Sequence, residues 1–421
     1  MVEEIEIARL GASGDGVAET PGGPLYVSYA LPGERVAIER EGTRGNLVRV
    51  ETASPDRVQP FCPYFGRCGG CAAQHVGPAL YGGWKRDIAV AALRQAGLNG
   101  EVGPLVDAHG DGRRRITLHV RRVEGAMQAG FMARRRHDLI AIERCPITAP
   151  ALAPAPKIAA ALGEVLAGTG KPLDVAVTAT GTGLDVDLRG SGDPGERRRR
   201  ALIAMATDFD LARLSLHGEI LVERRRPLVR MGESEVGPPP GGFLQATAAG
   251  EAALADRVVA ACGAARRVAD LFAGCGPFSL RLARTAEVHA VEMDPASLAA
   301  LDRAARETPQ LRRVTTEARD LFRRPLLGGE LAGFDAVVLD PPRAGAEAQI
   351  RQLAISTVPA VVMVSCDPGT YARDAAILVG AGYELGETVP VDQFKWGAPL
   401  ELVGTFRRAA PKKRRTSLRP R

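Results

Sequence analysis

The chain is predicted to be an α/β protein whose C-terminal part forms a doubly wound, Rossmann-like parallel sheet. Strand-like segments at 268–270, 288–292, 336–339 and 360–365 are separated by helix-like segments. Because parallel strands need long crossover connections, this alternation is typical of a doubly wound sheet. Upstream of residue 235, short strand-like segments indicate an N-terminal β-domain followed by a central mixed α/β region.

Residues 1–58 are predicted to form a small OB-like β-barrel. Short apolar runs alternate there with turns rich in glycine and proline, as in a series of short strands. OB-like barrels often bind single-stranded nucleic acid. A β-domain that only packs against its neighbour has the same strand spacing, so the spacing leaves both interpretations open.

A Gly-Pro-Pro-Pro-Gly-Gly sequence at 237–242 interrupts regular structure and marks the next domain boundary. We therefore assign 59–235 to the central region and 236–408 to the C-terminal domain. Segment 409–421 is basic and has no apolar periodicity. It is expected to be disordered unless RNA or another polyanion orders it.

The formal charge of +6 says little about partners, because the six Lys and Arg residues of 409–421 account for all of it. Local arginine runs are more informative, since each could contact phosphates or could simply be a solvated face. These runs are 113–115, 134–136, 197–200 and 224–226.

We expect a cytoplasmic protein with no membrane contact. The acidic N-terminus does not resemble a signal peptide. No apolar run approaches the roughly 20 residues needed to cross a bilayer. Nothing in the sequence points to an obligate protein partner.

Four of the seven cysteines have the spacing of a metal site: Cys62, Cys68 and Cys71 lie close together, and Cys145 follows downstream. An odd number of unevenly spaced cysteines favours metal ligation or catalysis over a disulfide framework. Four thiolates suit a [4Fe-4S] cluster or a structural zinc ion, and the spacing leaves both open.

The sequence Asp-Leu-Phe-Ala-Gly-Cys-Gly at 270–276 ends a strand and opens a helix. Gly274 and Gly276 allow a ligand to approach the backbone, and the helix N-terminus offers free amide donors. Glu292, at the end of the next strand, is placed to accept hydrogen bonds from a ribose diol. Ser279 replaces the third glycine of a dinucleotide fingerprint, which disfavours NAD.

Together with an Asp-Pro-Pro sequence at 340–342, the glycine-rich loop resembles that of an S-adenosylmethionine-dependent methyltransferase domain. Amino-group methyltransferases carry an aromatic residue after this sequence, but here Arg343 follows. A different chemistry is therefore expected, and Cys366 is the candidate nucleophile.

Cys366 and Glu401 suit a reaction at C5 of a pyrimidine ring. A thiolate that adds to C6 makes C5 nucleophilic, and a base must later remove the C5 proton so that the thiolate can leave. Cys366 follows an apolar strand. Glu401 is a carboxylate in an apolar stretch, where burial would raise its pKa.

Over nearly its whole length the chain resembles the bacterial RNA 5-methyluridine methyltransferase family. Phe-Leu-Gln at 243–245 is similar to the family's Phe-Phe-Gln, and Ser-Cys-Asp-Pro at 365–368 is similar to its Ser-Cys-Asn-Pro. Glu401 matches the family's proton-abstracting glutamate. The resemblance further implies that S-adenosylmethionine contacts Gln245, Phe272, Glu292, Asp320 and Asp340.

The resemblance also implies an RNA-binding TRAM domain at the N-terminus and a [4Fe-4S] cluster on the four cysteines. Because the family's tRNA-acting bacterial members look cluster-free, it favours 23S rRNA as the substrate. Asp367, Thr247, Pro277 and Pro399 depart from the family pattern.

Three other functions were compared with uridine methylation of 23S rRNA. A tRNA uridine methyltransferase would use the same chemistry. A 5-methylcytosine methyltransferase is disfavoured, because the Asp-Pro-Pro sequence lacks the second cysteine of those enzymes. A catalytically weak RNA-binding protein that assists ribosome assembly could retain the same domains.

Overall fold

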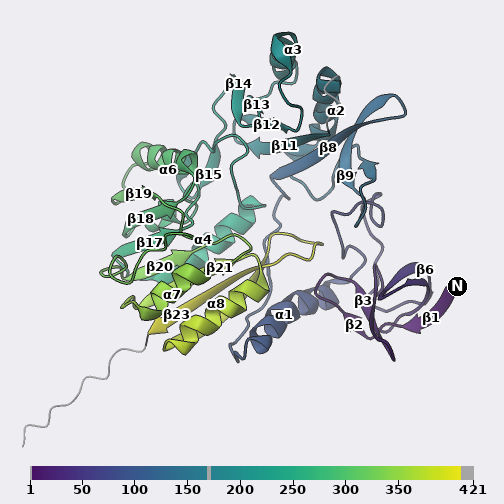
Figure 1. Cartoon of the computed structure of the whole chain (residues 1–421), viewed down its shortest axis with the longest axis horizontal. Helices are drawn as coiled ribbons and strands as arrows, with labels where there is room; N and C mark the ends of the chain where they lie inside the picture. Colours follow the sequence, from purple (N-terminus) through teal and green to yellow (C-terminus); the bar gives the residue numbers. More distant parts are fainter. Residues whose placement is uncertain (1, 168–171, 409–421) are drawn as a thin grey trace, which may run out of the picture.

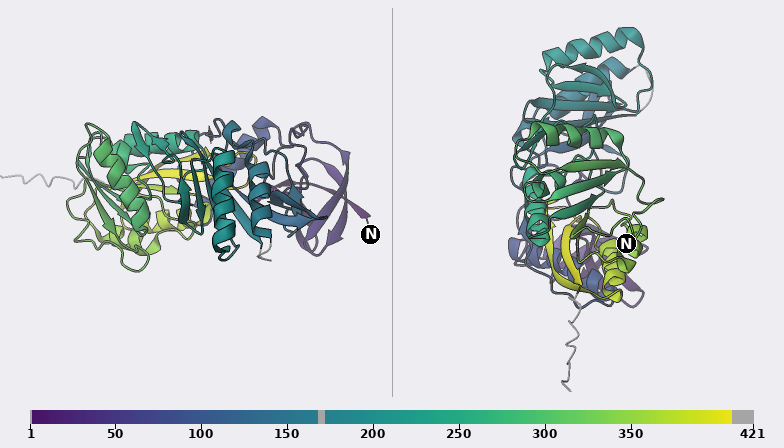
Figure 2. Two further views of the ribbon diagram at one scale, coloured as in Figure 1. Left: turned by 90° about the horizontal axis from the view of Figure 1, so that it is seen from above. Right: turned by 90° about the vertical axis from the view of Figure 1, so that its left-hand side faces the viewer.

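The computed structural model describes residues 2–167 and 172–408, which form four β-sheets in an elongated molecule (Figures 1 and 2). The predicted α/β class is confirmed. The basic segment 409–421 lies outside the described residues, so its predicted disorder is not addressed. Within the described ranges, no helix is long and apolar enough to cross a membrane.

The N-terminal sheet has six strands in the order β1-β5-β6-β4-β3-β2, and all neighbours are antiparallel except β4 and β6. Its small core contains Ile7, Val27 and Ile38. The strands are β1 (Val2–Glu6), β2 (Arg9–Leu10), β3 (Gly16–Thr20), β4 (Gly23–Val27), β5 (Arg35–Glu41) and β6 (Arg44–Thr52).

The central sheet has seven strands in the order β10-β9-β8-β11-β12-β13-β14, with α2 and α3 packed against it (Figure 1). Only β12 and β13 are parallel neighbours. The elements are β8 (Arg115–Val123), β9 (Ala126–Met132), β10 (Leu139–Ala141), a 3-10 turn (Pro150–Leu152), α2 (Ala155–Leu166), β11 (Leu173–Thr180), β12 (Gly183–Arg189), α3 (Gly195–Asp208), β13 (Arg213–Leu216) and β14 (Glu219–Glu223).

The C-terminal sheet has eight strands in the order β19-β18-β17-β20-β21-β23-β22-β7. The first five are mutually parallel, as predicted, whereas β23 runs antiparallel to both neighbours. The strands are β7 (Val106–Asp107), β17 (Arg267–Leu271), β18 (Glu287–Glu292), β19 (Val314–Ala318), β20 (Ala336–Leu339), β21 (Ala360–Ser365), β22 (Tyr383–Asp392) and β23 (Glu401–Arg408).

Helices cover both faces of this sheet, because alternate strand residues point to opposite sides. Leu271 and Leu339 face the core formed with α1, α7 and α8, and Val268 and Val338 face the core formed with α4 and α5. A hairpin of β15 (Val229–Met231) and β16 (Ser234–Val236) packs on α6. The helices are α1 (Pro78–Gln95), α4 (Ala248–Cys262), α5 (Ser279–Leu282), α6 (Pro295–Glu307), α7 (Glu347–Ile355) and α8 (Pro368–Gly380).

Two features differ from what the pattern suggested. The helix expected from about residue 278 is the single turn α5, since β18 begins five residues after it ends. Helix α1 packs against α8, and β7 pairs with β22, so segment 78–107 joins the C-terminal sheet although it precedes the central one. The residue boundaries of the domains stay a prediction.

Helix α1 holds the loop between β22 and β23 through a buried ion pair. Lys85 is fully buried, and its ammonium contacts Asp392 Oδ1 at 3.1 Å and donates to the Pro399 carbonyl at 2.7 Å. The Tyr81 hydroxyl donates to Asp392 Oδ2 at 2.6 Å. Both ends of the loop are thereby fixed to one helix from the N-terminal half of the chain.

We expect Asp392→Ala to lower the free energy of unfolding by about 3 kcal/mol, because it leaves the Lys85 ammonium buried without its partner. Urea unfolding monitored by circular dichroism measures the change. The exposed pair of Glu196 and Arg200 is the control, since Glu196→Ala should cost less than about 1 kcal/mol. Equal effects of the two substitutions would contradict the structural importance of the buried pair.

Candidate active site

A pocket of about 600 Å³ lies at the carboxyl ends of the parallel strands of the C-terminal sheet, where open α/β sheets bind their ligands. It brings together nearly all of the predicted catalytic and cofactor-binding residues. These lining residues are Gln245, Phe272, Gly274, Glu292, Asp320, Asp340, Cys366 and Glu401.

Gly276 supports the pocket from outside. Its φ is +87°, and a Cβ atom there would clash with Leu301 of α6, so only glycine fits. Ser279 occupies the position of the missing third glycine, and its hydroxyl donates to Asp270 Oδ2 at 2.6 Å. Burial raises the pKa of Asp270 to about 7. The loop is thus held by a hydrogen bond rather than by a third glycine.

Glu292 organises the same loop. Its Oε2 accepts from the Gly274 amide at 3.1 Å, and its Oε1 accepts from the amides of Met293 at 2.7 Å and Asp294 at 3.0 Å. A carboxylate has about four acceptor sites, so the predicted ribose contact remains possible on the side facing the pocket.

The pocket also contains an aromatic pair, of which the sequence indicated Phe272 but not Phe322. Phe322 is 45% exposed, and its ring centroid lies 5.5 Å from that of Phe272. Asp320, two residues before Phe322, accepts from the Phe322 amide at 3.0 Å and so holds the turn. Two phenyl rings beside carboxylates offer a planar heterocycle an apolar surface with polar groups at its edge.

Strand pairing brings Cys366 and Glu401 together. In the antiparallel ladder of β21 and β23, Ser365 is paired with Leu402. Extending this register by one residue sets Cys366 opposite Glu401, although the two are far apart in sequence. Both side chains line the same pocket.

The surroundings of these two groups favour their protonated forms. Burial raises the pKa of Glu401 to about 7. Burial, together with the negative charges of Glu401 and Asp340, raises the pKa of the Cys366 thiol to about 11, against the opposing influence of Arg343. Burial and the charge of Glu401 also raise the pKa of Asp340. The pocket therefore has an excess of carboxyl groups in a poorly solvated space.

A buried amide relay, which the sequence did not indicate, links the two sides of the site. Gln393 donates from Nε2 to Gln245 Oε1 at 2.6 Å and to Glu401 Oε1 at 3.0 Å. Gln245 in turn donates from Nε2 to Asp340 Oδ2 at 2.9 Å. A glutamine next to a strand end has no local sequence signal, because folding brings its partners Gln245 and Glu401 to it from two other segments.

Three of the departures from the family pattern have clear structural roles. Asp367 caps α8 by accepting from the Thr370 amide at 2.9 Å, and Thr247 caps α4 by accepting from the Gly250 amide at 2.8 Å. Asp and Thr are both favourable N-cap residues. The Pro399 carbonyl accepts the hydrogen bond from Lys85 described above.

Most of the arginine runs pair with acids of the same chain rather than forming free cationic patches. Arg114 contacts Glu251, and Arg225 contacts Asp210. Arg134 and Arg135 both contact Asp15. These contacts favour a structural role for many of the arginines that the sequence left open.

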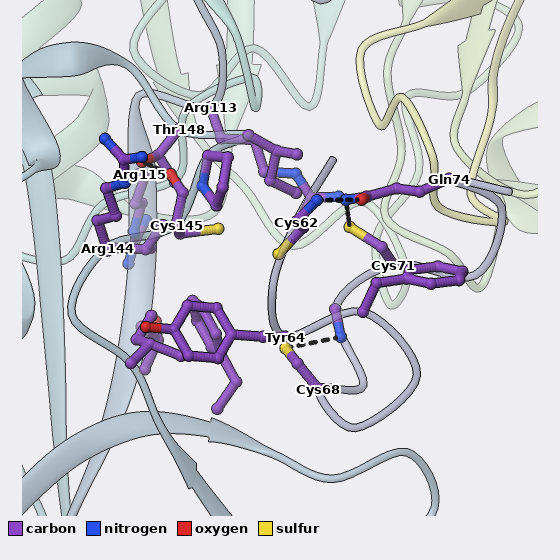
Figure 3. A pocket seen from close by; sticks show the side chains of 18 residues that line it. Cys62, Tyr64, Cys68, Cys71, Gln74, Arg113, Arg115, Arg144, Cys145 and Thr148 are labelled. Carbon is purple, nitrogen blue, oxygen red and sulfur yellow. Dashed lines mark hydrogen bonds between the residues drawn. The ribbon is translucent and has the colours of Figure 1, made fainter. Parts of the chain in front are cut away.

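The four predicted metal-ligating cysteines line a second cavity of about 200 Å³. Figure 3 shows the thiols of Cys62, Cys68 and Cys71, from one loop, on the same cavity as Cys145 from a separate segment. In the described part of the chain, no three His, Cys, Asp or Glu residues are arranged to hold a single metal ion.

The chemistry of this cavity fits a group that binds thiolates. Four thiols around one cavity are the donor set of a thiolate-bound centre. Burial raises the pKa of Cys71 to about 12, so without such a centre this thiol keeps its proton, while the Gln74 hydrogen bond and the charge of Arg113 act in the opposite direction. The Gln74 side chain donates to Cys71 Sγ at 3.3 Å, and the Gly70 amide donates to Cys68 Sγ at 3.4 Å. N–H donors of this kind stabilise sulfur ligands in iron–sulfur sites.

No family model matches the sequence. An uncharacterized RNA methyltransferase of Rhizobium meliloti is 47% identical over 96% of this chain and 98% of its own length. The 23S rRNA (uracil(1939)-C(5))-methyltransferase RlmD of Chromohalobacter salexigens is 35% identical over 98% of this chain and 91% of its own length.

Among solved structures, the tRNA (uracil-54, C5)-methyltransferase of Pyrococcus abyssi, in complex with S-adenosyl-L-homocysteine, matches 96% of this chain and all of its own. The TM-score is 0.72 at 20% identity, which confirms the fold. With the full-length relatives, the comparison shows that the chain belongs to the RNA (uracil-C5)-methyltransferase family.

Proposed function

We propose that this chain transfers a methyl group from S-adenosylmethionine to C5 of a uridine in 23S rRNA. One observation carries the proposal: a cysteine and a buried carboxylate face each other across paired strands within a nucleotide-sized pocket. The RlmD relative supports 23S rRNA, and the Pyrococcus structure makes tRNA the alternative substrate to be tested.

The pocket suits a cationic methyl donor. Its lining includes the acids Glu251, Glu292, Asp294, Asp320, Asp340 and Glu401. S-adenosylmethionine, as a second substrate, supplies an electrophilic methyl group on a positively charged sulfur. That charge is stabilised by nearby carboxylates, and its presence lowers their pKa values. The Phe272 and Phe322 rings offer the adenine an apolar surface.

Cys366 then acts as the nucleophile. Its sulfur adds to C6 of the uracil, which makes C5 electron-rich enough to take the methyl group. Because the pKa of the free thiol is raised to about 11, Cys366 must first lose its proton to solvent, and the thiolate then adds to C6 as the C5–C6 π bond breaks and its electrons move onto the ring. The exposed side chain of Arg343, whose charge lowers the thiol pKa, favours this step.

Glu401 acts as the base that completes the reaction. A pKa near 7 allows it to be ionised near neutral pH while it is still basic enough to remove the C5 proton. Gln393 holds the carboxylate in place. Loss of the proton expels the Cys366 sulfur and restores the aromatic ring of the methylated base.

The four cysteines Cys62, Cys68, Cys71 and Cys145 would hold a [4Fe-4S] cluster. The cluster would tie the loop of the first three to the segment that carries Cys145. The donor set and the N–H groups directed at two of the sulfurs support this assignment. The N-terminal sheet would contact the RNA backbone, together with those arginines that are not held by acids of the same chain.

Unmodified 23S rRNA transcript should gain label at uridine C5 when it is incubated with this protein and methyl-labelled S-adenosylmethionine. Cys366→Ala should abolish the labelling, whereas Cys262→Ser, at a buried cysteine remote from the pocket, should retain it. Nuclease digestion with mass spectrometry locates the methyl group. RNA binding without label would support the assembly-factor alternative, and label on tRNA transcripts alone would contradict the 23S assignment.

Glu401→Gln should reduce turnover by about a hundredfold or more, because the C5 proton then has no base. The rate of the wild type should rise as pH increases through about 7, since only ionised Glu401 accepts the proton.

Glu401→Gln also removes a negative charge beside Cys366. The pKa of the Cys366 thiol should therefore fall, so that iodoacetamide alkylates this thiol faster at a fixed pH. Glu384→Gln, at an exposed position on β22, is the control. Unchanged alkylation in Glu401→Gln would contradict the proposed coupling.

Protein purified without oxygen should contain iron and sulfide and show the broad visible absorbance of an iron–sulfur cluster. Cys68→Ser should remove that absorbance, because three thiolates hold the cluster less well than four. Cys262→Ser should leave it unchanged. A colourless wild-type protein that contains zinc would refute the assignment.

A further inference from the structure

We propose that Phe61 and Trp396 form a stacking platform for an unpaired nucleobase that neighbours the target uridine in the bound RNA. The inference rests on the proposed function, because it takes single-stranded RNA to be the ligand. It assigns to these two rings a role that is separate from the chemistry in the pocket.

The two rings lie side by side near the pocket. Phe61 is 51% exposed, and its ring centroid lies 4.8 Å from that of Trp396 in an edge-to-face arrangement. Trp396 belongs to the loop between β22 and β23, two residues after Phe394, which lines the pocket. The exposed phenyl ring is thus connected to the pocket rim through a single loop.

Trp396 is held in a backbone conformation that a bulky residue rarely adopts. Its φ is +63°, a left-handed conformation that is unfavourable for a residue with a Cβ atom. Its carbonyl accepts from the amides of Ala72 at 2.7 Å and Ala73 at 3.0 Å, and its own amide donates to the Tyr81 hydroxyl at 2.9 Å. Strain maintained in this way is typical of functional sites.

These hydrogen bonds place the Trp396 ring behind Phe61 before any ligand arrives. A pre-positioned surface loses little conformational entropy when it binds, which favours affinity. The His109 ring, 4.9 Å from the Trp396 centroid, supports the indole from another side. Phe61 is therefore the exposed face of a rigid aromatic group.

Positive charge next to the rings favours a nucleic acid as the occupant. The guanidinium of Arg113 lies 5.9 Å from the Phe394 ring centroid, and its buried Nε has no hydrogen-bond partner in the described structure. The Lys395 ammonium lies 5.2 Å from the Trp396 ring centroid, but it also pairs with the Asp107 carboxylate, so Arg113 is the stronger source of positive charge. Exposed aromatic rings beside cations are how proteins bind single strands without reading their sequence.

Entry of the target uridine into the pocket disturbs the base stacking of the RNA. A uridine that enters the pocket must leave its base stack, so its neighbours on the strand lose their stacking partner. An exposed ring near the pocket rim replaces that partner. The platform would therefore recover part of the energy that unstacking costs, without selecting a particular base.

The test uses a short single-stranded RNA with one central uridine, and a series in which each flanking nucleotide in turn is abasic. Phe61→Leu keeps an apolar side chain but loses the ring, and it should raise the Kd for this RNA about tenfold. Phe61→Tyr keeps a ring, and its Kd should stay within about twofold of the wild-type value. Ile355→Ala, at an exposed apolar residue outside both cavities, is the matched control. Fluorescence anisotropy of labelled RNA measures Kd.

An abasic site at one flanking position of the RNA should raise the Kd of the wild-type protein by a factor similar to that caused by Phe61→Leu. The same abasic RNA should bind the Phe61→Leu protein about as well as the complete RNA does. Such non-additivity identifies the base that contacts the ring. The indole emission should also change when RNA binds, and Trp396→Phe should remove the change, because the other tryptophan, Trp84, is buried.

Phe61 is next to Cys62 in the sequence, so a second variant at a distant position is needed. Trp396→Gly serves this purpose, and glycine adopts the positive φ at this position without strain. It should weaken binding as Phe61→Leu does. Unchanged affinity in both variants, or strictly additive effects of ring and base removal, would overturn the platform. Methyl transfer is assayed separately: its absence in the wild type would refute the proposed activity, while the binding experiments would still decide the role of Phe61.

Discussion

The antiparallel pairing of β21 with β23 is the constraint on which the site depends. Five parallel strands place the ligand loops at one edge of the sheet, but they do not bring Glu401 to Cys366. The reversed strand β23 does so, because its first residue lies opposite the residue that follows β21. A shift of this register by one residue would turn Glu401 to the other face of the sheet. The ladder itself therefore determines the spacing of Cys366 and Glu401.

The loop that precedes β23 is fixed by segments from outside the parallel sheet. Lys85 and Tyr81 of α1 hold its ends and its middle, and the cysteine loop contacts it through Ala72 and Ala73. The Trp84 indole of the same helix donates to the Gly11 carbonyl of the N-terminal domain at 2.9 Å. Helix α1 and the cysteine loop thus contact the loop beside the pocket directly, and the N-terminal domain is joined to it through α1.

Sequence patterns predicted the parts of this structure that depend on local residues. Four of the five parallel strands, the glycine loop, Cys366 and Glu401 were recognisable, because each is defined by its neighbours along the chain, whereas β19 was not predicted. Lys85 and Gln393 were not, since their partners are brought near only by folding. The placement of α1 was missed for the same reason: its amphipathic pattern does not say which sheet it covers. Ser279 counted against a dinucleotide, but its bond to Asp270 became visible only in the structure.

The many carboxyl groups that line the pocket affect how the demethylated donor leaves after methyl transfer. When the methyl group leaves, the donor changes from a sulfonium cation to a neutral thioether. The attraction that held the fresh donor then disappears, while every other contact stays the same. The methylated donor and its demethylated product differ by one positive charge, in a site where water screens charge poorly. The lining acids would therefore favour exchange of one for the other without any movement of the protein.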